Sequence, residues 1–184
     1  MLREEDIYRI FDELDIEYKV IHHEALFTIE AAKDIDKKLG VEICKNLFLS
    51  TKHGTEFYLL FMKGSKKFNT GKVSKQVGVP RMTFASDENM EAFLGVKPGS
   101  VTPLGLLNDK DNKVNFLIDS QVVNEEYVSM HPLINTATVV IKTKDLLEKI
   151  IPYANKSVRM VCWSAETTRE DFALLPTGTL SYMI

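Results

Sequence analysis

The chain has few of the residues from which redox, zinc and covalent catalytic centres are built. Only two of its 184 residues are cysteines, Cys44 and Cys162, and they lie far apart in apolar segments. Without a C-x-x-C motif they indicate neither a zinc site nor a redox pair, and buried free thiols in a reducing compartment are expected. The G-x-S-x-G motif of a nucleophilic serine and the glycine patterns of phosphate loops are also missing. Any hydrolysis by this chain is therefore expected to use a positioned water molecule.

Long hydrophobic runs are missing as well. No apolar run approaches the length of a membrane span, and the first six residues are acidic, unlike the basic start of a signal peptide. We therefore expect a cytoplasmic protein without a membrane partner. A chain of 184 residues, 45% hydrophobic and 27% charged, suits one globular domain with a sizeable core.

Apolar periodicity predicts alternating helices and strands. A first helix is expected around Ile7, Ile10, Phe11 and Leu14, and further helices over about 29–39, 70–77 and 144–151 and after Ser86; strands are expected over 18–22, 46–51, 56–62, 81–85, 114–119, 136–142 and 157–163. Thr28 is the expected N-cap of the second helix, and 52–54 is the turn of a hairpin. The fold class is therefore predicted as α+β, a single domain (1–163) with a central mixed, largely antiparallel sheet flanked by helices. No role is assigned to the tail, 164–184.

A rigid loop follows the helix after Ser86. Residues 95–105 contain three glycines and two prolines. Glycine allows positive φ and proline fixes φ, so such a loop can point backbone amides at an oxygen that becomes negative during a reaction. An ordinary tight connection is the alternative interpretation.

Acidic residues are missing from 57–86. This stretch contains six of the 23 Lys and Arg residues and none of the 26 Asp and Glu residues. The whole chain has a net charge of −3, so the excess of positive charge in 57–86 is local. Such a local excess indicates contacts with phosphates more than non-specific electrostatic binding. A solvated lysine loop is the simpler alternative. The cations concerned are Lys63, Lys66, Lys67, Lys72, Lys75 and Arg81.

Three side chains are candidates for chemistry. Lys45 begins a strand on the pleat face of Leu47, so its ammonium is either solvated or directed at a phosphate or a polarised carbonyl. Asn46 is either a structural amide or one that orients a substrate. His131, held extended by the following proline, is either structural or a hydrogen-bonding group or general base. His22 and His23 point to opposite strand faces, so no metal site is expected.

Four segments together resemble a known family, the YbaK-like, free-standing aminoacyl-tRNA deacylases related to the editing insertion of bacterial prolyl-tRNA synthetase. The resemblance spans about residues 18–151 and is carried by Lys45–Leu49, Phe84–Ser86, Leu94–Leu106 and His131–Thr138. The Lys-Asn pair and the long glycine loop look most like the branch that hydrolyses Ala-tRNA(Pro). A sibling branch, which clears Cys-tRNA(Pro), usually has another residue after the lysine.

The resemblance implies catalytic roles for Lys45, at the substrate's terminal phosphate or ester, for the loop amides of Gly95 and Gly99, and for His131. It implies substrate contacts for Asn46, His23, Thr28, Pro98 and Ser100, and tRNA contacts for Lys63, Lys66, Lys67, Lys72 and Lys75. No cofactor, metal or DNA partner is implied; the partners are tRNA(Pro) mischarged with alanine and, less directly, prolyl-tRNA synthetase. A deacylase for another mischarged tRNA such as Cys-tRNA(Pro), a non-catalytic tRNA-binding or regulatory module and a hydrolase of small non-tRNA esters or amides are alternatives.

Overall fold

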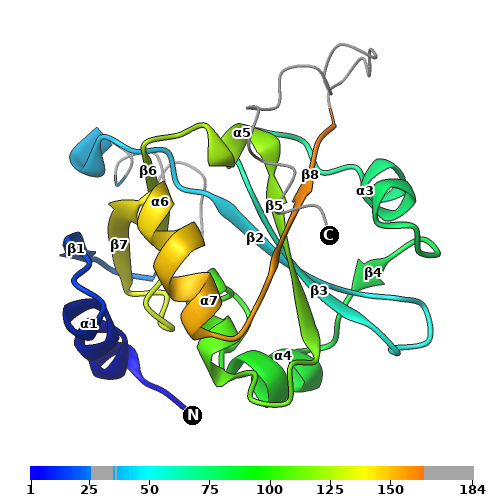
Figure 1. Cartoon of the computed structure of the whole chain (residues 1–184), viewed down its shortest axis with the longest axis horizontal. Coiled ribbons are helices and arrows are strands. Elements are labelled where there is room, and N and C mark those ends of the chain that lie inside the picture. Colours follow the sequence, from blue (N-terminus) through cyan, green and yellow to red (C-terminus); the bar gives the residue numbers. More distant parts are fainter. Residues whose placement is uncertain (26–34, 36, 164–184) are drawn as a thin grey trace.

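The computed structural model describes residues 1–25, 35 and 37–163, which fold into two β-sheets covered by helices (Figure 1). The strands are β1 (Tyr18–His22), β2 (Lys45–Ser50), β3 (Phe57–Met62), β4 (Thr83–Phe84), β5 (Val114–Asp119), β6 (Tyr127–Met130), β7 (Ala137–Lys142) and β8 (Val158–Val161). The helices are α1 (Glu4–Glu13), α3 (Thr70–Val77), α4 (Asp87–Leu94), η1 (Pro103–Asn108), α5 (Ser120–Val123), α6 (Thr143–Asp145), η2 (Leu146–Ile150) and α7 (Ile151–Tyr153).

The larger sheet is mixed and has the strand order β4-β2-β3-β5-β8. β2 and β3 form the predicted antiparallel hairpin, with Lys45 opposite Met62 and Ser50 opposite Phe57. β5 runs parallel to β3, and β8 runs parallel to β5. Every residue of β3 is buried, because the strand lies between β2 and β5 and both faces of the sheet are packed against other residues. The predicted α+β fold with a central mixed sheet is confirmed.

A second, three-stranded antiparallel sheet has the order β1-β7-β6. The division of the strands between two sheets is not predictable from the sequence, because the period of a strand indicates which face is buried and not which strand is its neighbour. Three short elements, η1, α5 and β6, were not predicted either, because they have only four to six residues each. Two of these are fixed by cap side chains, Thr102 for η1 and Asp119 for α5.

The last predicted helix is one helical stretch from Thr143 to Tyr153. Its middle, Leu146–Ile150, is a π-helix. Pro152 lies in the following turn and has no amide hydrogen, so the regular pattern of i to i−4 hydrogen bonds cannot continue through it. Apolar periodicity predicts where such a helix lies, but not this widened turn.

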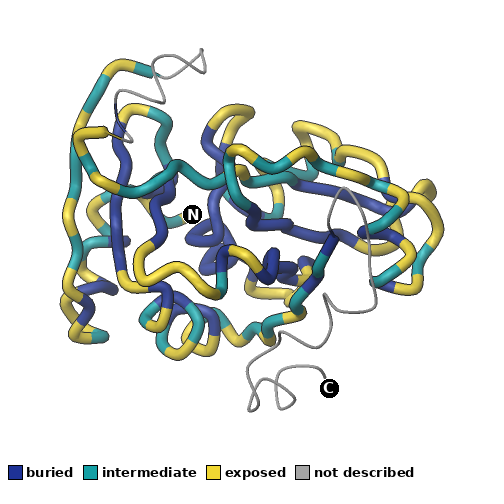
Figure 2. Tube along the Cα trace, turned by 90° about the horizontal axis from the view of Figure 1, so that it is seen from above, coloured by how far each residue is buried: buried dark blue, intermediate teal, exposed yellow. Residues whose placement is uncertain are grey.

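Two apolar clusters lie on opposite faces of the mixed sheet. The larger joins one face to α1, η1 and the three-stranded sheet through residues such as Phe11, Phe61 and Val139. The smaller joins the other face to α3 through Leu60 and Val73. In Figure 2 the buried residues follow the strands, whereas the exposed residues lie mainly in turns and connections.

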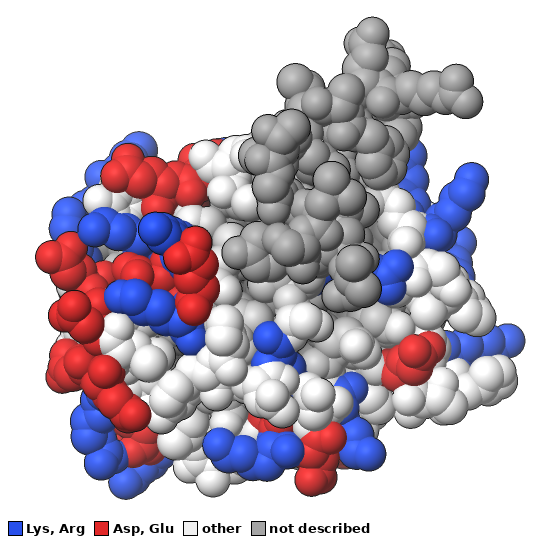
Figure 3. Space-filling model, in the orientation of Figure 1, with Lys and Arg blue, Asp and Glu red and all other residues white. Residues whose placement is uncertain are grey.

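Charged side chains are unevenly distributed over the surface. In Figure 3, acidic and basic groups are interspersed over α1 and the 143–153 helix at the left, while the side that carries α3 and β4, at the right, shows mostly basic groups. Among the described residues, no helix is long and apolar enough to cross a membrane.

Candidate active site

The start of β2 presents Lys45 and Asn46 on opposite faces of the mixed sheet. Lys45 is exposed, and its Nζ donates a hydrogen bond to the carbonyl oxygen of Lys66 at 3.1 Å. Asn46 lies on the face of Phe48, which belongs to the larger cluster. The Asn46 Oδ1 atom is buried and has no hydrogen-bond partner among the described residues. Because a buried acceptor without a partner is costly, this atom is a candidate for a substrate donor.

The connection from β6 to β7 holds His131. Its Nδ1 donates to the carbonyl oxygen of Ala137 at 3.0 Å, which leaves Nε2 as the acceptor of the neutral ring. Burial lowers the pKa of His131 below its ordinary 6.5, against the opposing effect of the Ala137 hydrogen bond, and the nearby His23 lowers it further. Leu133 in the same connection has a left-handed φ of 68° while its side chain is buried. Such strain is typical of connections held in place for function.

His23 lies beside this connection. Its amide donates to the carbonyl oxygen of Thr136 at 2.9 Å. Its ring lies between the Glu24 carbonyl oxygen, 2.7 Å from Nδ1, and the Thr138 hydroxyl, 2.9 Å from Nε2. The carbonyl can only accept, so Nδ1 carries a proton and the neutral ring accepts the Thr138 proton at Nε2. His23 is thereby fixed next to His131, as a substrate-contacting residue would need to be.

The glycine loop consists of a helix cap followed by a turn. Gly95, with φ of 66°, is the C-cap of α4, and its amide bonds to Glu91. The Ser100 amide bonds to the Lys97 carbonyl oxygen at 3.0 Å, while Gly99 has φ of 86°. With Pro98 before it, Gly99 occupies the position of a type II turn that requires positive φ. A Cβ on Gly99 would lie 3.7 Å from Nδ2 of Asn135, so the turn adjoins the connection that holds His131.

The two halves of the site meet where the sheets adjoin. Ile43 forms a parallel bridge with Ser129 of β6, and the Ser129 hydroxyl donates to the Glu42 carbonyl oxygen at 3.2 Å. Paired residues of parallel strands point to the same side, and side chains alternate. Lys45 and His131 each follow the bridged pair by two residues, so both leave their strands on the same side.

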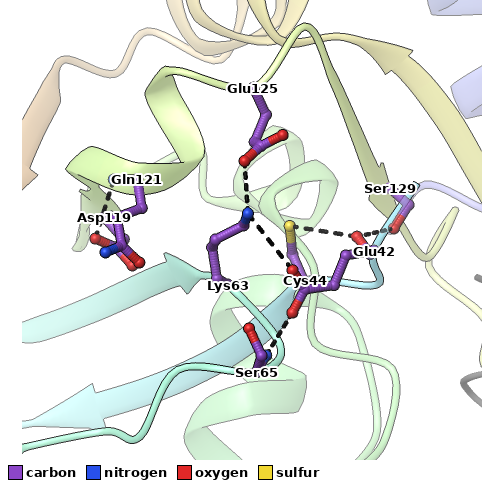
Figure 4. Close-up of polar contacts among 8 residues, drawn as sticks. All are labelled: Glu42, Cys44, Lys63, Ser65, Asp119, Gln121, Glu125 and Ser129. Carbon is purple, nitrogen blue, oxygen red and sulfur yellow. Dashed lines mark hydrogen bonds and ion pairs between the residues drawn. The ribbon is translucent and has the colours of Figure 1, made fainter.

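Polar contacts between distant segments fix this junction (Figure 4). Lys63 pairs with Glu125 at 2.5 Å and with Glu42 at 3.6 Å. A Cβ on Gly64 would lie 2.2 Å from the Ile43 carbonyl oxygen, so only glycine allows this close approach. Cys44 lies among these groups, and burial raises the pKa of its thiol to about 12. Cys44 is therefore a thiol at neutral pH and not an activated nucleophile.

A model of the aminoacyl-tRNA editing domain matches residues 23–149, a range that contains Lys45, the glycine loop and His131. The chain belongs to this family. As an editing domain it is an aminoacyl-tRNA deacylase, a hydrolase of the ester that joins an amino acid to tRNA.

Relatives of this editing domain agree with the family match. The prolyl-tRNA editing protein ProX of Acetoanaerobium sticklandii is 36% identical over 140 residues, which cover 76% of this chain and 85% of that protein. The prolyl-tRNA synthetase associated domain-containing protein 1 of Mus musculus is 33% identical over 138 residues, or 73% of this chain and 81% of that one. A solved structure described as a candidate trans-editing enzyme for prolyl tRNA synthetase superposes with a TM-score of 0.64 over 88% of this chain and 97% of its own. At 19% identity that structure shows the shared fold.

The lysines that we expected to bind tRNA have different surroundings in the editing domain. Lys66 pairs with the buried carboxylate of Asp119 at 2.7 Å and lies 3.9 Å from the centroid of the Trp163 ring, with 11% of its side chain exposed. Lys63 forms ion pairs with Glu42 and Glu125. Both charges are thus paired with carboxylates of the protein, that of Lys66 in a buried pair and that of Lys63 at the surface. Lys67 and Lys75 are exposed and Lys72 is half-buried, and tRNA contact by any of the five lysines stays a prediction.

Several residues of the editing domain that support the site were not predicted from the sequence. Asp119, Trp163, Ser129 and Asn135 reach it only through contacts between distant segments, so no local motif marks them. Ser100 is buried and Pro98 is exposed in the glycine turn. Thr28 lies outside the described residues. Within them, no group of three or more His, Cys, Asp and Glu side chains is placed to hold a metal ion.

Proposed function

We propose that this editing domain hydrolyses the ester of Ala-tRNA(Pro), releasing alanine and free tRNA(Pro). The observation that carries the proposal is that the glycine turn adjoins the connection of the neutral His131 imidazole, while Lys45 lies two residues beyond the bridge that joins the two sheets. Lys45 and His131 leave on the same side, and the turn adjoins the His131 connection at Asn135. Similarity to ProX and to a prolyl-tRNA synthetase associated protein supports tRNA(Pro) as the carrier.

Each group has a role in ester hydrolysis by water. The Lys45 ammonium offsets the negative charge of the terminal phosphate or of the ester region. The Gly99 amide, which has no hydrogen-bond partner among the described residues, donates to the ester oxygen as it becomes negative. His131 Nε2 accepts a hydrogen bond from the attacking water or from the terminal ribose hydroxyl and positions it. No covalent intermediate is needed.

Alanine is the proposed amino acid because a synthetase pocket built for proline cannot strongly reject a smaller side chain. A missing methylene changes binding by only about 1–3 kcal/mol, so mischarged alanine requires a second site that accepts small residues and excludes large ones. A wall formed by a glycine turn suits such a site. The pyrrolidine ring of proline is bulkier than alanine, and its amine is secondary.

The test compares deacylation of Ala-tRNA(Pro), Cys-tRNA(Pro) and a free alanine ester by the wild type, Lys45→Ala and Lys52→Ala. Lys52 is an exposed cation in the hairpin turn and serves as the matched control. We expect Ala-tRNA(Pro) to react fastest. Lys45→Ala should lower kcat/KM on the order of 100-fold with the fold intact, and Lys52→Ala should have no effect.

Other outcomes would contradict the proposal in distinct ways. Faster release of cysteine would assign the domain to the Cys-tRNA(Pro) branch, and equal rates on the free ester would indicate a hydrolase that ignores tRNA. Binding of Ala-tRNA(Pro) without release would indicate a non-catalytic module. Full activity of Lys45→Ala would remove Lys45 from the site.

A further inference from the structure

An exposed aromatic pair lies on the α3 side of the mixed sheet. Phe84 of β4 is 66% exposed, and its ring faces that of Phe68 with centroids 6.3 Å apart and planes tilted by 56°. Phe68 in turn packs against the smaller apolar cluster. A single exposed phenylalanine is unremarkable, but this one extends a packed aromatic side chain into solvent and so offers an additional ring face for stacking.

The surroundings of this pair are basic. The pair lies within 57–86, the stretch that contains no Asp or Glu. Lys67 and Arg81 are exposed nearby in sequence, and Lys67 and Phe68 line the same pocket of about 390 Å³. The carboxylate of Asp119, which reaches Lys66 in this stretch, is paired with the Lys66 ammonium. An aromatic pair in a positive field complements a ligand that has both π-faces and phosphates.

The pair also adjoins the candidate active site. Phe84 lies opposite Leu49 of β2, so the two side chains point to the same face of the sheet, which is also the face of Lys45. Lys45 precedes Leu49 by four residues, which is roughly 13 Å along the strand. The Lys45 ammonium bonds to the carbonyl oxygen of Lys66, next to Lys67 and Phe68. A ligand that reaches from Lys45 along β2 would therefore meet the aromatic pair.

We propose that Phe84 and Phe68, together with Lys67, bind unpaired nucleotides at the acceptor end of the tRNA substrate by stacking and phosphate contact. This inference rests on the proposed function for the identity of the ligand. A single strand fits better than a duplex, because bases inside a duplex are stacked on one another and do not present their faces to a protein side chain. Stacking is tolerant of sequence, so this surface contributes affinity for the unpaired end and does not select the amino acid.

The test measures binding of two labelled RNAs to the full chain as a function of salt: a short single strand ending in C-C-A, and a blunt-ended duplex of equal phosphate number. The variants are Phe84→Ala, Phe84→Leu and Phe84→Tyr, with Tyr153→Ala as control for an exposed aromatic elsewhere, on α7. We expect Phe84→Ala and Phe84→Leu to weaken single-strand binding roughly 5- to 150-fold and Phe84→Tyr to retain it. Duplex binding and the control should not change. Lys67→Gln should reduce the salt slope for the single strand by about 0.7.

Wild-type affinity in Phe84→Ala, or an equal loss for both RNAs, would overturn the stacking role. Wild-type affinity in Phe84→Leu would indicate apolar contact of the kind a peptide makes. An unchanged salt slope in Lys67→Gln would remove the phosphate contact. These measurements need no hydrolysis: loss of single-strand binding in a protein that does not deacylate Ala-tRNA(Pro) would refute the proposed function and leave this surface standing. Conversely, hydrolysis of Ala-tRNA(Pro) together with wild-type single-strand binding in Phe84→Ala would support the proposed function and refute the role of this surface.

Discussion

His131 is held as a neutral imidazole by its surroundings. Burial lowers its pKa below 6.5, and the Ala137 carbonyl oxygen occupies Nδ1, so Nε2 is the acceptor at neutral pH. Because the unfolded chain binds this proton more readily than the folded one, the contribution of His131 to stability is complete above about pH 6.5. It is lost as pH falls through the lowered pKa.

The same shift predicts the pH dependence of catalysis. With the wild type, kcat/KM for Ala-tRNA(Pro) should stay level from pH 8 to about 6.5 and fall only below that, as the ring becomes protonated. His131→Ala should cost on the order of 10- to 100-fold and abolish the fall. His53→Ala, in the exposed hairpin turn, is the matched control. An unaltered rate and profile in His131→Ala would return His131 to a structural role.

Single residues show clearly where sequence reasoning ends. Lys45, Asn46 and His131 were predictable as candidates, because their positions at strand ends follow from local pattern. The burial of Lys66 was not predictable, because its partners Asp119 and Trp163 are far away in sequence. A lysine-rich stretch therefore predicts a basic surface, but not which of its members are compensated inside the protein.

The glycine loop connects local sequence to the shape of the site. Its Pro98-Gly99 turn follows from composition, since proline and a residue of positive φ define a type II turn. Its proximity to Asn135 depends on how the β6–β7 connection packs and has no local signature. For the same reason the hairpin of β2 and β3 was predictable, whereas β6 and the division into two sheets were not.

Gly99→Ala tests the role of this turn. The φ of 86° disfavours any residue with a Cβ, and the added methyl group would lie on the exposed turn beside Asn135. We expect at least roughly tenfold slower release of alanine, with little loss of tRNA affinity because the basic surface is unchanged. The measurement is single-turnover deacylation of Ala-tRNA(Pro), with a separate binding assay.

Gly54→Ala is the control for strain alone. Gly54 has φ of 63° in the hairpin turn, and a Cβ there would meet nothing within 4 Å. Both substitutions should lower the free energy of unfolding by about 1 kcal/mol, and only Gly99→Ala should slow release. If the two variants are equally active, the turn does not form a wall of the site.

In the whole molecule, the mixed sheet separates two environments. Its α3 face carries Lys45, the aromatic pair and the basic stretch, while its other face packs against the three-stranded sheet and the glycine loop. The site lies where the two sheets meet, at the bridge between Ile43 and Ser129. In the proposed function, the charged end of the tRNA approaches along the α3 face and the amino acid lies against the Pro98-Gly99 turn.

The most direct test of this account is single-turnover deacylation of Ala-tRNA(Pro) and Pro-tRNA(Pro) with the editing domain in excess. Steric exclusion can exceed the 10- to 200-fold discrimination that one methylene gives in a binding pocket. We therefore predict that alanine is released at least roughly 100-fold faster than proline. Comparable rates on the two substrates would contradict the account, because a site that also hydrolyses the correct product cannot serve as the second sieve.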